Sequence, residues 1–176
     1  MTFELRPWQA ADLQSLVKYA NNYNIAKNLT DRFPYPYSED DGRAFIAFAN
    51  THTPKHVFAI VVGGEAVGGI GIHPKSGIER KNAELGYWIG EPFWGQGIVS
   101  AAVAQMLKYG FETFDIIRIF ARPFEHNLAS KRVLQKAGFL FEARLEKTLF
   151  KQGEYLDELI YAVRKPMIKE PQKPLL

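Results

Sequence analysis

Apolar residues recur at two different spacings along the chain, and each spacing predicts one kind of secondary structure. Short runs that alternate or are rich in β-branched residues predict strands. Apolar positions three or four residues apart predict helices. The predicted strands lie at 3–6, 56–62, 65–73, 82–89, 116–122, 139–150 and 155–163, and the predicted helices at 10–21, 38–49, 99–114 and 127–137.

This order, β-α-α-β-β-β-α-β-α-β-β, predicts an α/β fold in which helices cover both faces of a mixed sheet. The sequence shows no internal repeat and no linker long enough to separate two domains. We therefore expect a single domain over residues 1–165. Residues 166–176 contain three prolines and are expected to form a mobile C-terminal tail.

Composition limits the classes of protein to consider. With 47% hydrophobic and 23% charged residues, the chain is that of an ordinary globular protein. The net charge of +3 is spread along the chain, so no nucleic-acid site is expected. The N-terminus lacks a signal-peptide pattern, no apolar run could span a membrane, and cysteine is absent, which together predict a cytoplasmic protein. Monomer and homodimer both remain open.

The segment from Asn82 to Phe114 organises the rest of the chain. A strand over 82–89 leads to the turn Trp94-Gly95-Gln96-Gly97, and an amphipathic helix follows. Glycines directly before a helix leave backbone N–H groups uncovered at its positive end, where a phosphate can bind. The same glycines could simply serve a tight turn. Neither a Rossmann nor a P-loop pattern is present.

Several short motifs, in this order and spacing, resemble the GNAT (Gcn5-related) N-acetyltransferase superfamily. The resemblance extends from about Phe3 to Arg164 and is strongest to the branch of the ribosomal-protein N-terminal acetyltransferases (RimJ/RimL-like). The motifs are Leu5-Arg6-Pro7-Trp8, Ala83-Glu84-Leu85-Gly86-Tyr87-Trp88-Ile89, Trp94-Gly95-Gln96-Gly97, His126-Asn127-Leu128-Ala129-Ser130, Lys136-Ala137-Gly138-Phe139 and Gly153-Glu154-Tyr155-Leu156-Asp157.

The resemblance implies acetyl-CoA as the acetyl donor, bound where the fourth and fifth strands of a mostly antiparallel sheet separate. It places the pyrophosphate on backbone amides at the start of the central helix and the pantetheine along the fourth strand like an added strand. Val99 departs from the small residue that the family usually has in the turn. The implied cofactor-binding residues are Tyr87, Trp88, Ile89, Gln96, Gly97, Ile98, Val99, Ser100, Asn127 and Ser130.

Acetyl transfer to an amine requires removal of a proton, because alkyl ammonium pKa values lie around 10. Glu84 is the candidate base, and a structural ion pair is the alternative role for this residue. Ser130 is the candidate proton donor to the thiolate, and its alternative role is to pack the helix start. The tyrosine that many family members have on this helix is replaced by Leu134, and the late glutamate of the ribosomal-protein enzymes by Leu149.

The amine acceptor is the least determined part. Trp8, Phe33, Tyr35 and Tyr37 are the candidate acceptor-binding residues, although their rings could instead pack the loop against the core. The first hypothesis is a peptide or protein α-amine. A polyamine or aminoglycoside, and a non-catalytic acyl-CoA-binding role, are the alternatives. The four histidines lack metal-ligand spacing, so no metal is expected.

Overall fold

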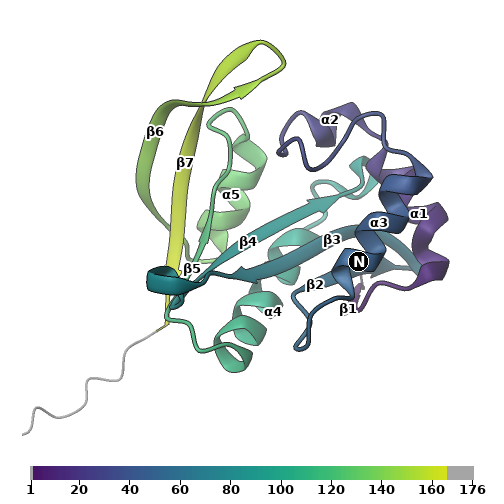
Figure 1. Cartoon of the computed structure of the whole chain (residues 1–176), viewed down its shortest axis with the longest axis horizontal. Helices are drawn as coiled ribbons and strands as arrows, with labels where there is room; N and C mark the ends of the chain where they lie inside the picture. Colours follow the sequence, from purple (N-terminus) through teal and green to yellow (C-terminus); the bar gives the residue numbers. More distant parts are fainter. Residues whose placement is uncertain (1, 166–176) are drawn as a thin grey trace, which may run out of the picture.

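The computed structural model describes residues 2–165, so the predicted tail at 166–176 lies outside the described part. One sheet of seven strands forms the centre of the fold, in the order β1-β2-β3-β4-β5-β7-β6 (Figure 1). The strands are β1 (Glu4–Arg6), β2 (Val57–Val62), β3 (Glu65–Pro74), β4 (Asn82–Ile89), β5 (Arg118–Ala121), β6 (Leu140–Lys151) and β7 (Glu154–Arg164).

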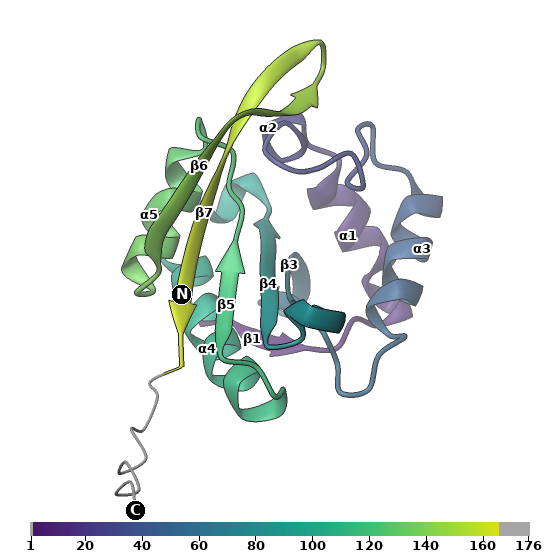
Figure 2. The same cartoon turned by 60° about the vertical axis from the view of Figure 1, so that its left-hand side comes forward.

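All neighbouring strands are antiparallel except β4 and β5, which run in the same direction (Figure 2). Their pairing covers only three positions, from Asn82 opposite Arg118 to Glu84 opposite Phe120. Beyond Glu84, β4 continues to Ile89 without a partner on that side. The expected separation between the fourth and fifth strands is therefore present and lies at the middle of the sheet.

The helices form one layer on each face of the sheet. The helices α4 (Ile98–Thr113) and α5 (Leu128–Lys136) cover one face, while α1 (Leu13–Ala20) and α3 (Glu39–Ala49) cover the other. A short helix, α2 (Tyr23–Ala26), was not predicted. Single 3-10 turns lie at η1 (Ala10–Asp12), η2 (Gly77–Glu79) and η3 (Glu91–Phe93).

Each face has its own hydrophobic core. The larger core joins β2–β5, β7 and α5 to the buried side of α4, with Ile70, Ile72, Val103, Met106 and Ile119 almost fully buried. The smaller core lies under α1 and α3 and contains Leu16, Ala59, Trp8 and Trp88. Alternation along β4 divides the two: Leu85 and Ile89 contact the larger core and Trp88 the smaller.

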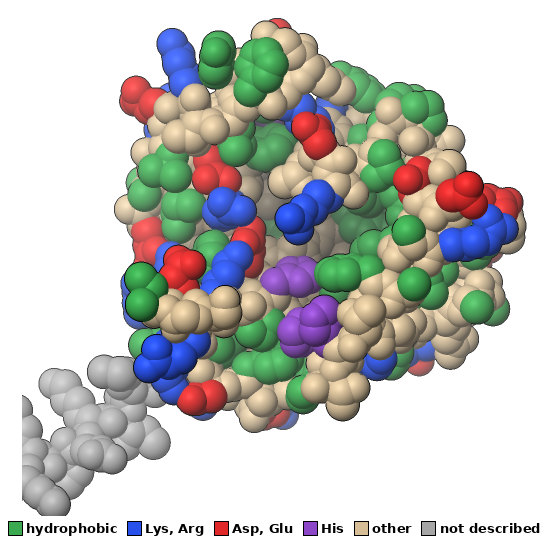
Figure 3. Space-filling model, in the orientation of Figure 1, with side chains coloured by type: hydrophobic (Ala, Val, Ile, Leu, Met, Phe, Trp, Pro, Cys, Tyr) green, Lys and Arg blue, Asp and Glu red, His purple; other side chains and the backbone are tan. Residues whose placement is uncertain are grey.

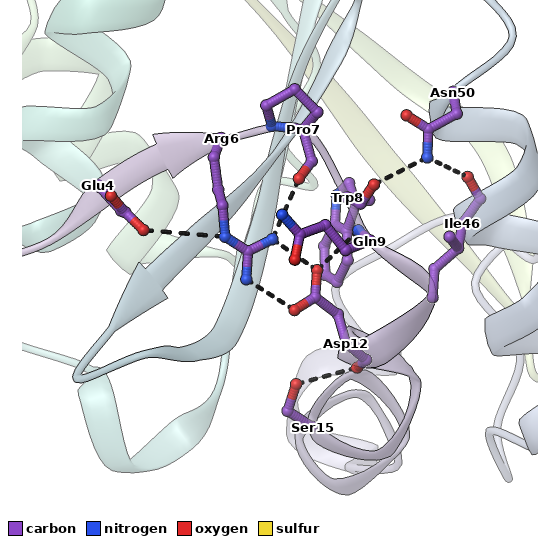
Figure 4. Close-up of polar contacts among 9 residues, drawn as sticks. All are labelled: Glu4, Arg6, Pro7, Trp8, Gln9, Asp12, Ser15, Ile46 and Asn50. Atoms are coloured by element: carbon purple, nitrogen blue, oxygen red, sulfur yellow. Dashed lines mark hydrogen bonds and ion pairs between the residues drawn. The ribbon is translucent and has the colours of Figure 1, made fainter.

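A polar network fixes the chain between β1 and α1 (Figure 4). The Asp12 side chain is buried and accepts two hydrogen bonds from Arg6, both of 2.7 Å. The backbone N–H of Gln9 donates a third, of 2.8 Å, to the same carboxylate. Asn50, after α3, donates to the Trp8 carbonyl oxygen at 2.9 Å. These contacts orient the N-terminal segment under which the smaller core forms.

Most element boundaries agree with the sequence expectations, and the exceptions have local causes. Gly63 and Gly64 have φ of 57° and 87°, which suits the predicted tight hairpin between β2 and β3. Pro74 was expected in a loop but ends β3, where it lies opposite Ala83. In β6 the register shifts between Leu145 and Leu149, and this bulge was not predicted.

Candidate active site

A cleft of about 440 Å³ opens where β4 and β5 separate. Its walls come from β4, from the turn before α4, from the start of α5 and from the region of α2. Nine of the ten residues expected to bind the cofactor line it, and Gln96 does not. The nine are Tyr87, Trp88, Ile89, Gly97, Ile98, Val99, Ser100, Asn127 and Ser130.

One end of the cleft is formed by the N-terminus of α4. Gly97 has φ of 78°, a left-handed conformation that glycine adopts without strain, and it directly precedes the helix. The first backbone N–H groups of the helix therefore point out of its end, as in anion-binding sites. Gln96 has a structural role, because its side chain donates to the Pro92 carbonyl oxygen at 2.9 Å. Val99 is half-buried and packs against the larger core.

Two hydroxyl groups meet in the middle of the cleft. Tyr87 Oη lies 2.8 Å from Ser130 Oγ, which joins β4 to the start of α5. Burial raises the pKa of Tyr87 to about 12, and the bond to Ser130 lowers it by less. This tyrosine therefore keeps its proton at neutral pH. The sequence predicts a role only for the backbone of Tyr87, and it predicts Ser130 as a proton donor without naming a partner. Spacing along the chain gives no sign that the two side chains meet.

Asn127 starts α5, and its side-chain oxygen accepts a 3.0 Å hydrogen bond from the Ser130 backbone N–H. Asn127 is thus a helix cap that fixes the position of Ser130. Asn127, which the sequence predicts to contact the cofactor, therefore has a structural role in this fold.

The opposite face of the sheet carries a row of charges at the point of separation. Lys75 contacts Glu84 at 2.6 Å, Glu84 contacts Arg122 at 3.0 Å, and Arg122 contacts Glu158 at 3.5 Å. Figure 3 shows a hollow in the face that carries α3, with basic, acidic and histidine side chains around it. The row contains two acids and two bases, so its charges balance.

The contacts of Glu84 favour the structural role over the role of base. Burial raises the pKa of Glu84, but hydrogen bonds from Lys75 and Arg122 outweigh burial and leave the pKa below its usual value. Glu84 is therefore held ionised by two cations, and such a carboxylate is a weak proton acceptor. Its assignment as the base stays a prediction.

The sequence comparisons agree with this geometry. The model of the acetyltransferase (GNAT) domain family matches residues 2–140. The chain belongs to the GNAT acetyltransferase family. This match confirms the family, the fold class and the enzyme class expected from the motifs.

Individual GNAT relatives align over part of their length. The chain is 35% identical over 102 residues to an uncharacterized N-acetyltransferase, YoaA, of Bacillus subtilis, covering 58% of this chain and 57% of YoaA. It is 31% identical over 83 residues to the ribosomal-protein-serine acetyltransferase of Escherichia coli, covering 47% and 46%. The chain thus spans about half the length of these relatives.

A solved GNAT structure aligns over almost the whole chain. It is RimL, a ribosomal L7/L12 alpha-N-protein acetyltransferase, in complex with coenzyme A. The TM-score is 0.82 with 24% sequence identity, covering 93% of this chain and 94% of RimL. At this identity the similarity establishes the fold.

The aromatic residues expected at the acceptor side of this GNAT fold divide into two groups. Trp8 and Tyr37 are only 2% and 5% exposed, so they pack the smaller core and offer no open surface. Phe33 is half-buried with its ring 5.4 Å from that of Trp88, and Tyr35 is exposed beside Tyr23. Only Phe33 and Tyr35 can therefore contact an acceptor without rearrangement of the core.

The tip of the β6–β7 hairpin contacts the α2 region beside a second cavity. Tyr23 donates to Gln152 at 2.9 Å, and Lys151 contacts Asp31 at 3.0 Å. The cavity is lined by Tyr23, Lys27, His126, Lys151, Gln152, Glu154 and Leu156. Three of these seven side chains are lysine or histidine, and one is acidic.

The described residues, 2–165, contain neither a cluster of metal-ligating side chains nor a membrane-spanning helix. Within this part of the chain, no group of three or more His, Cys, Asp or Glu side chains could hold a metal ion. No helix there is both long enough and apolar enough to cross a membrane.

Proposed function

We propose that this protein transfers the acetyl group of acetyl-CoA to a primary amine, specifically the α-amine of a protein or peptide. The observation that carries the proposal is the cleft itself. It connects the N-terminus of α4 to the Tyr87–Ser130 hydroxyl pair at the separation of β4 and β5. The amine would attack the thioester directly while both substrates are bound.

The cleft residues suit the three chemical parts of acetyl-CoA. Backbone N–H groups of Ile98, Val99 and Ser100 would bind the pyrophosphate. The backbone of Tyr87 to Ile89, which has no β5 partner, would pair with the amides of the pantetheine arm. Acetyl-CoA supplies an activated acetyl group as a thioester.

The hydroxyl pair is suited to protonate the leaving sulfur. As the amine nitrogen bonds to the acetyl carbon, the C–S bond breaks and its electron pair stays on sulfur. Ser130 would donate its proton to this thiolate, and Tyr87, which stays protonated at neutral pH, would replace the proton on Ser130. A proton from the acceptor nitrogen then returns the pair to its starting state. This pair takes the place of the tyrosine missing at Leu134.

The charges on the α1–α3 face of the sheet, which we call the acceptor face because the amine would approach from there, support an acceptor with one amine on an uncharged body. A polyamine or aminoglycoside requires several carboxylates directed at its cations, because unpaired buried cations are costly. Two acids of the final hairpin are engaged elsewhere: Asp157 accepts from Arg144 at 2.7 Å, and Glu158 contacts Arg122. The exposed rings of Tyr35 and Tyr23 add apolar surface near this side. A peptide N-terminus with a small or apolar first residue fits these groups.

Steady-state acetylation kinetics would test the proposal. Short peptides with free α-amines, spermidine and kanamycin would be compared as acceptors, with acetyl-CoA consumption as the readout. We expect the highest kcat/KM for the peptides. A preference for spermidine or kanamycin would assign the site to polycations, and binding of acetyl-CoA without turnover of any amine would indicate a non-catalytic acyl-CoA-binding protein.

A further inference from the structure

On the acceptor face of the sheet, next to the separation of β4 and β5, two facing positions, Gly71 and Gly86, lack side chains. We call this pair of glycines the floor. Gly71 on β3 lies directly opposite Gly86 on β4. Residues directly opposite each other in an antiparallel pair point to the same side of the sheet. A Cβ atom added to Gly86 would meet nothing within 4 Å. The floor is therefore open above Gly86, where a small group can descend, whereas the space above Gly71 is filled by His73 Nε2, the His56 carbonyl oxygen and Val57 Cγ2, each 3.0–3.1 Å from such a Cβ position.

The titratable side chain of His73 lies next to this floor and is directed toward Gly71. It follows Gly71 by two residues on β3 and lies opposite Glu84, so it shares the face of Gly71, Glu84 and Gly86. Its Nε2 atom is 3.0 Å from the position that a Cβ of Gly71 would take. The imidazole thus points along β3 toward the pair of glycines and away from the end of the strand.

The charges near His73 favour its neutral form. Burial lowers the pKa of His73, Glu84 raises it, and the positive charges of Lys75, His52 and Arg32 lower it further. The net effect places the pKa below its ordinary value of 6.5. Nearby His56, whose own pKa is lowered by burial and by His52 and His73, lies on the preceding segment. At neutral pH the imidazole is therefore uncharged and has a nitrogen lone pair.

We propose that His73 is the general base of the reaction and accepts a proton from the acceptor ammonium over the Gly71–Gly86 floor. This proposal rests on the proposed acetyltransferase function and deepens it. In this step an N–H bond of the ammonium breaks, its electron pair stays on nitrogen, and the proton bonds to Nε2 of His73. The free amine then attacks the acetyl carbon, and the imidazolium returns its proton to water in the hollow.

Two features favour His73 over the neighbouring carboxylates. Glu84 is held ionised by Lys75 and Arg122, and Glu158, whose pKa is raised by burial, lies on β7, two strands beyond β4 and farther from His73. His73 has no ion pair among the described residues. Glu84, on the strand next to His73, would stabilise the imidazolium that forms when the proton is transferred.

The test is the pH profile of kcat/KM for a peptide acceptor in wild-type protein and in the His73→Gln variant. We expect about a 100-fold loss at pH 7, in the range typical of general-base removal. The difference in kcat/KM between the two proteins should become smaller as the pH rises past the α-amino pKa of about 8, because most of the acceptor is then already a free amine and requires no base. Calorimetry should give the same acetyl-CoA affinity for both proteins.

His52→Gln is the matched control, because it removes a half-buried imidazole from the same region while leaving the floor intact. It should keep the wild-type rate above the acidic limb, and because the charge of His52 lowers the pKa of His73, it should move that limb slightly to higher pH. Equal rates and profiles for wild type and His73→Gln would overturn the proposal, whereas absence of turnover by wild type would overturn the proposed function instead.

A measurement on wild-type protein covers the case in which His73→Gln does not fold. NMR titration of the assigned imidazoles should give His73 a pKa equal to that of the acidic limb of kcat/KM. A His73 pKa that differs from this limb would show that another group is the base.

Discussion

The two faces of the sheet differ in how their functional groups are supplied. On the α4–α5 face, one continuous segment from β4 through the glycine turn to α4 provides most of the cleft. On the α1–α3 face, the groups around the floor come from separate elements: Gly71 and His73 from β3, Glu84 from β4, Arg122 after β5 and Glu158 from β7.

The faces also differ in which atoms they use. The α4–α5 face would bind the cofactor through backbone N–H groups at a helix start, whose positions follow from local conformation. The α1–α3 face would bind the acceptor through side chains, whose positions follow from strand register and from ion pairs. A single substitution at the start of α4 should therefore strongly lower the affinity for the cofactor. Substitutions on the α1–α3 face should change the rate by amounts that differ from residue to residue.

The largest effect is expected from a charge placed at the start of α4. Gly97→Glu puts a carboxylate where the pyrophosphate would bind, and such like-charge contacts cost several kcal/mol. We expect acetyl-CoA to bind at least about 100-fold more weakly by calorimetry. Gly63→Glu is the matched control, since Gly63 also has positive φ and open space at Cβ but lies in the β2–β3 turn. Equal losses in both variants would show that backbone strain, and not the phosphate site, is responsible.

The next largest effect is expected from the Arg6–Asp12 network, which fixes the chain between β1 and α1. Asp12→Asn should lower the free energy of unfolding by about 2–3 kcal/mol, less than for a fully buried pair because Arg6 keeps contact with water. Burial raises the pKa of Asp12, but Arg6 and the Gln9 N–H outweigh burial and lower it overall. The Asp12 contribution is therefore complete above the unfolded-state pKa of about 4 and is lost as the pH falls through the folded-state pKa.

Chemical denaturation of Asp12→Asn between pH 3 and 7 would measure this contribution. Glu4→Gln, which changes the exposed partner of Arg6, is the control and should alter stability by less than about 1 kcal/mol. A stability difference between wild type and Asp12→Asn that does not change with pH would contradict the assignment.

A smaller effect is expected at the hydroxyl pair. Ser130→Ala and Tyr87→Phe should each lower kcat by about tenfold, at the low end for acid–base groups because water can also protonate a thiolate. Since the two hydroxyls act in series, the double variant should lose little more than either single variant. Single-turnover kinetics on the three variants would measure this. Multiplicative losses would indicate that the hydroxyls act independently.

The smallest effect separates the two interpretations of Glu84. Its negative charge raises the pKa of His73, so Glu84→Gln should move the acidic limb of kcat/KM to lower pH, by up to about one unit. At pH 7 the rate should change little if His73 is the base. A loss of about 100-fold or more across the pH range would identify Glu84 as the base after all.

Local patterns were sufficient to predict the strand, the glycine turn and the helix that form the cleft on the α4–α5 face. The alternation over Asn82–Ile89, the glycine turn and the helical spacing after it lie within 33 consecutive residues. Each is read from spacing alone, because dihedral angles and helix ends depend on near neighbours. Ser38 likewise caps α3 as expected, with Asp41 completing the capping box.

The contacts between distant segments could not be predicted in the same way. The contact between Tyr87 and Ser130 joins residues 43 positions apart, and the approach of His73 to the glycine floor depends on the register of β3 with β4. A shift of one residue would move every side chain to the other face, and no local pattern fixes that register. Aromatic residues have the same limitation: Trp8 and Phe33 look alike in sequence, but only the first is enclosed by the smaller core.

The contacts between the hairpin tip and the α2 region have a consequence for the order of folding. Tyr23 and Gln152 are 129 positions apart, and Asp31 and Lys151 are 120 apart. Joining such distant segments costs more loop-closure entropy than joining neighbours. The partners on α2 and its loop are exposed, so these contacts should be among the last to form and the first to open. Amide hydrogens near residues 151–154 should then exchange with solvent much faster than those of β3 and β4, by local opening without global unfolding.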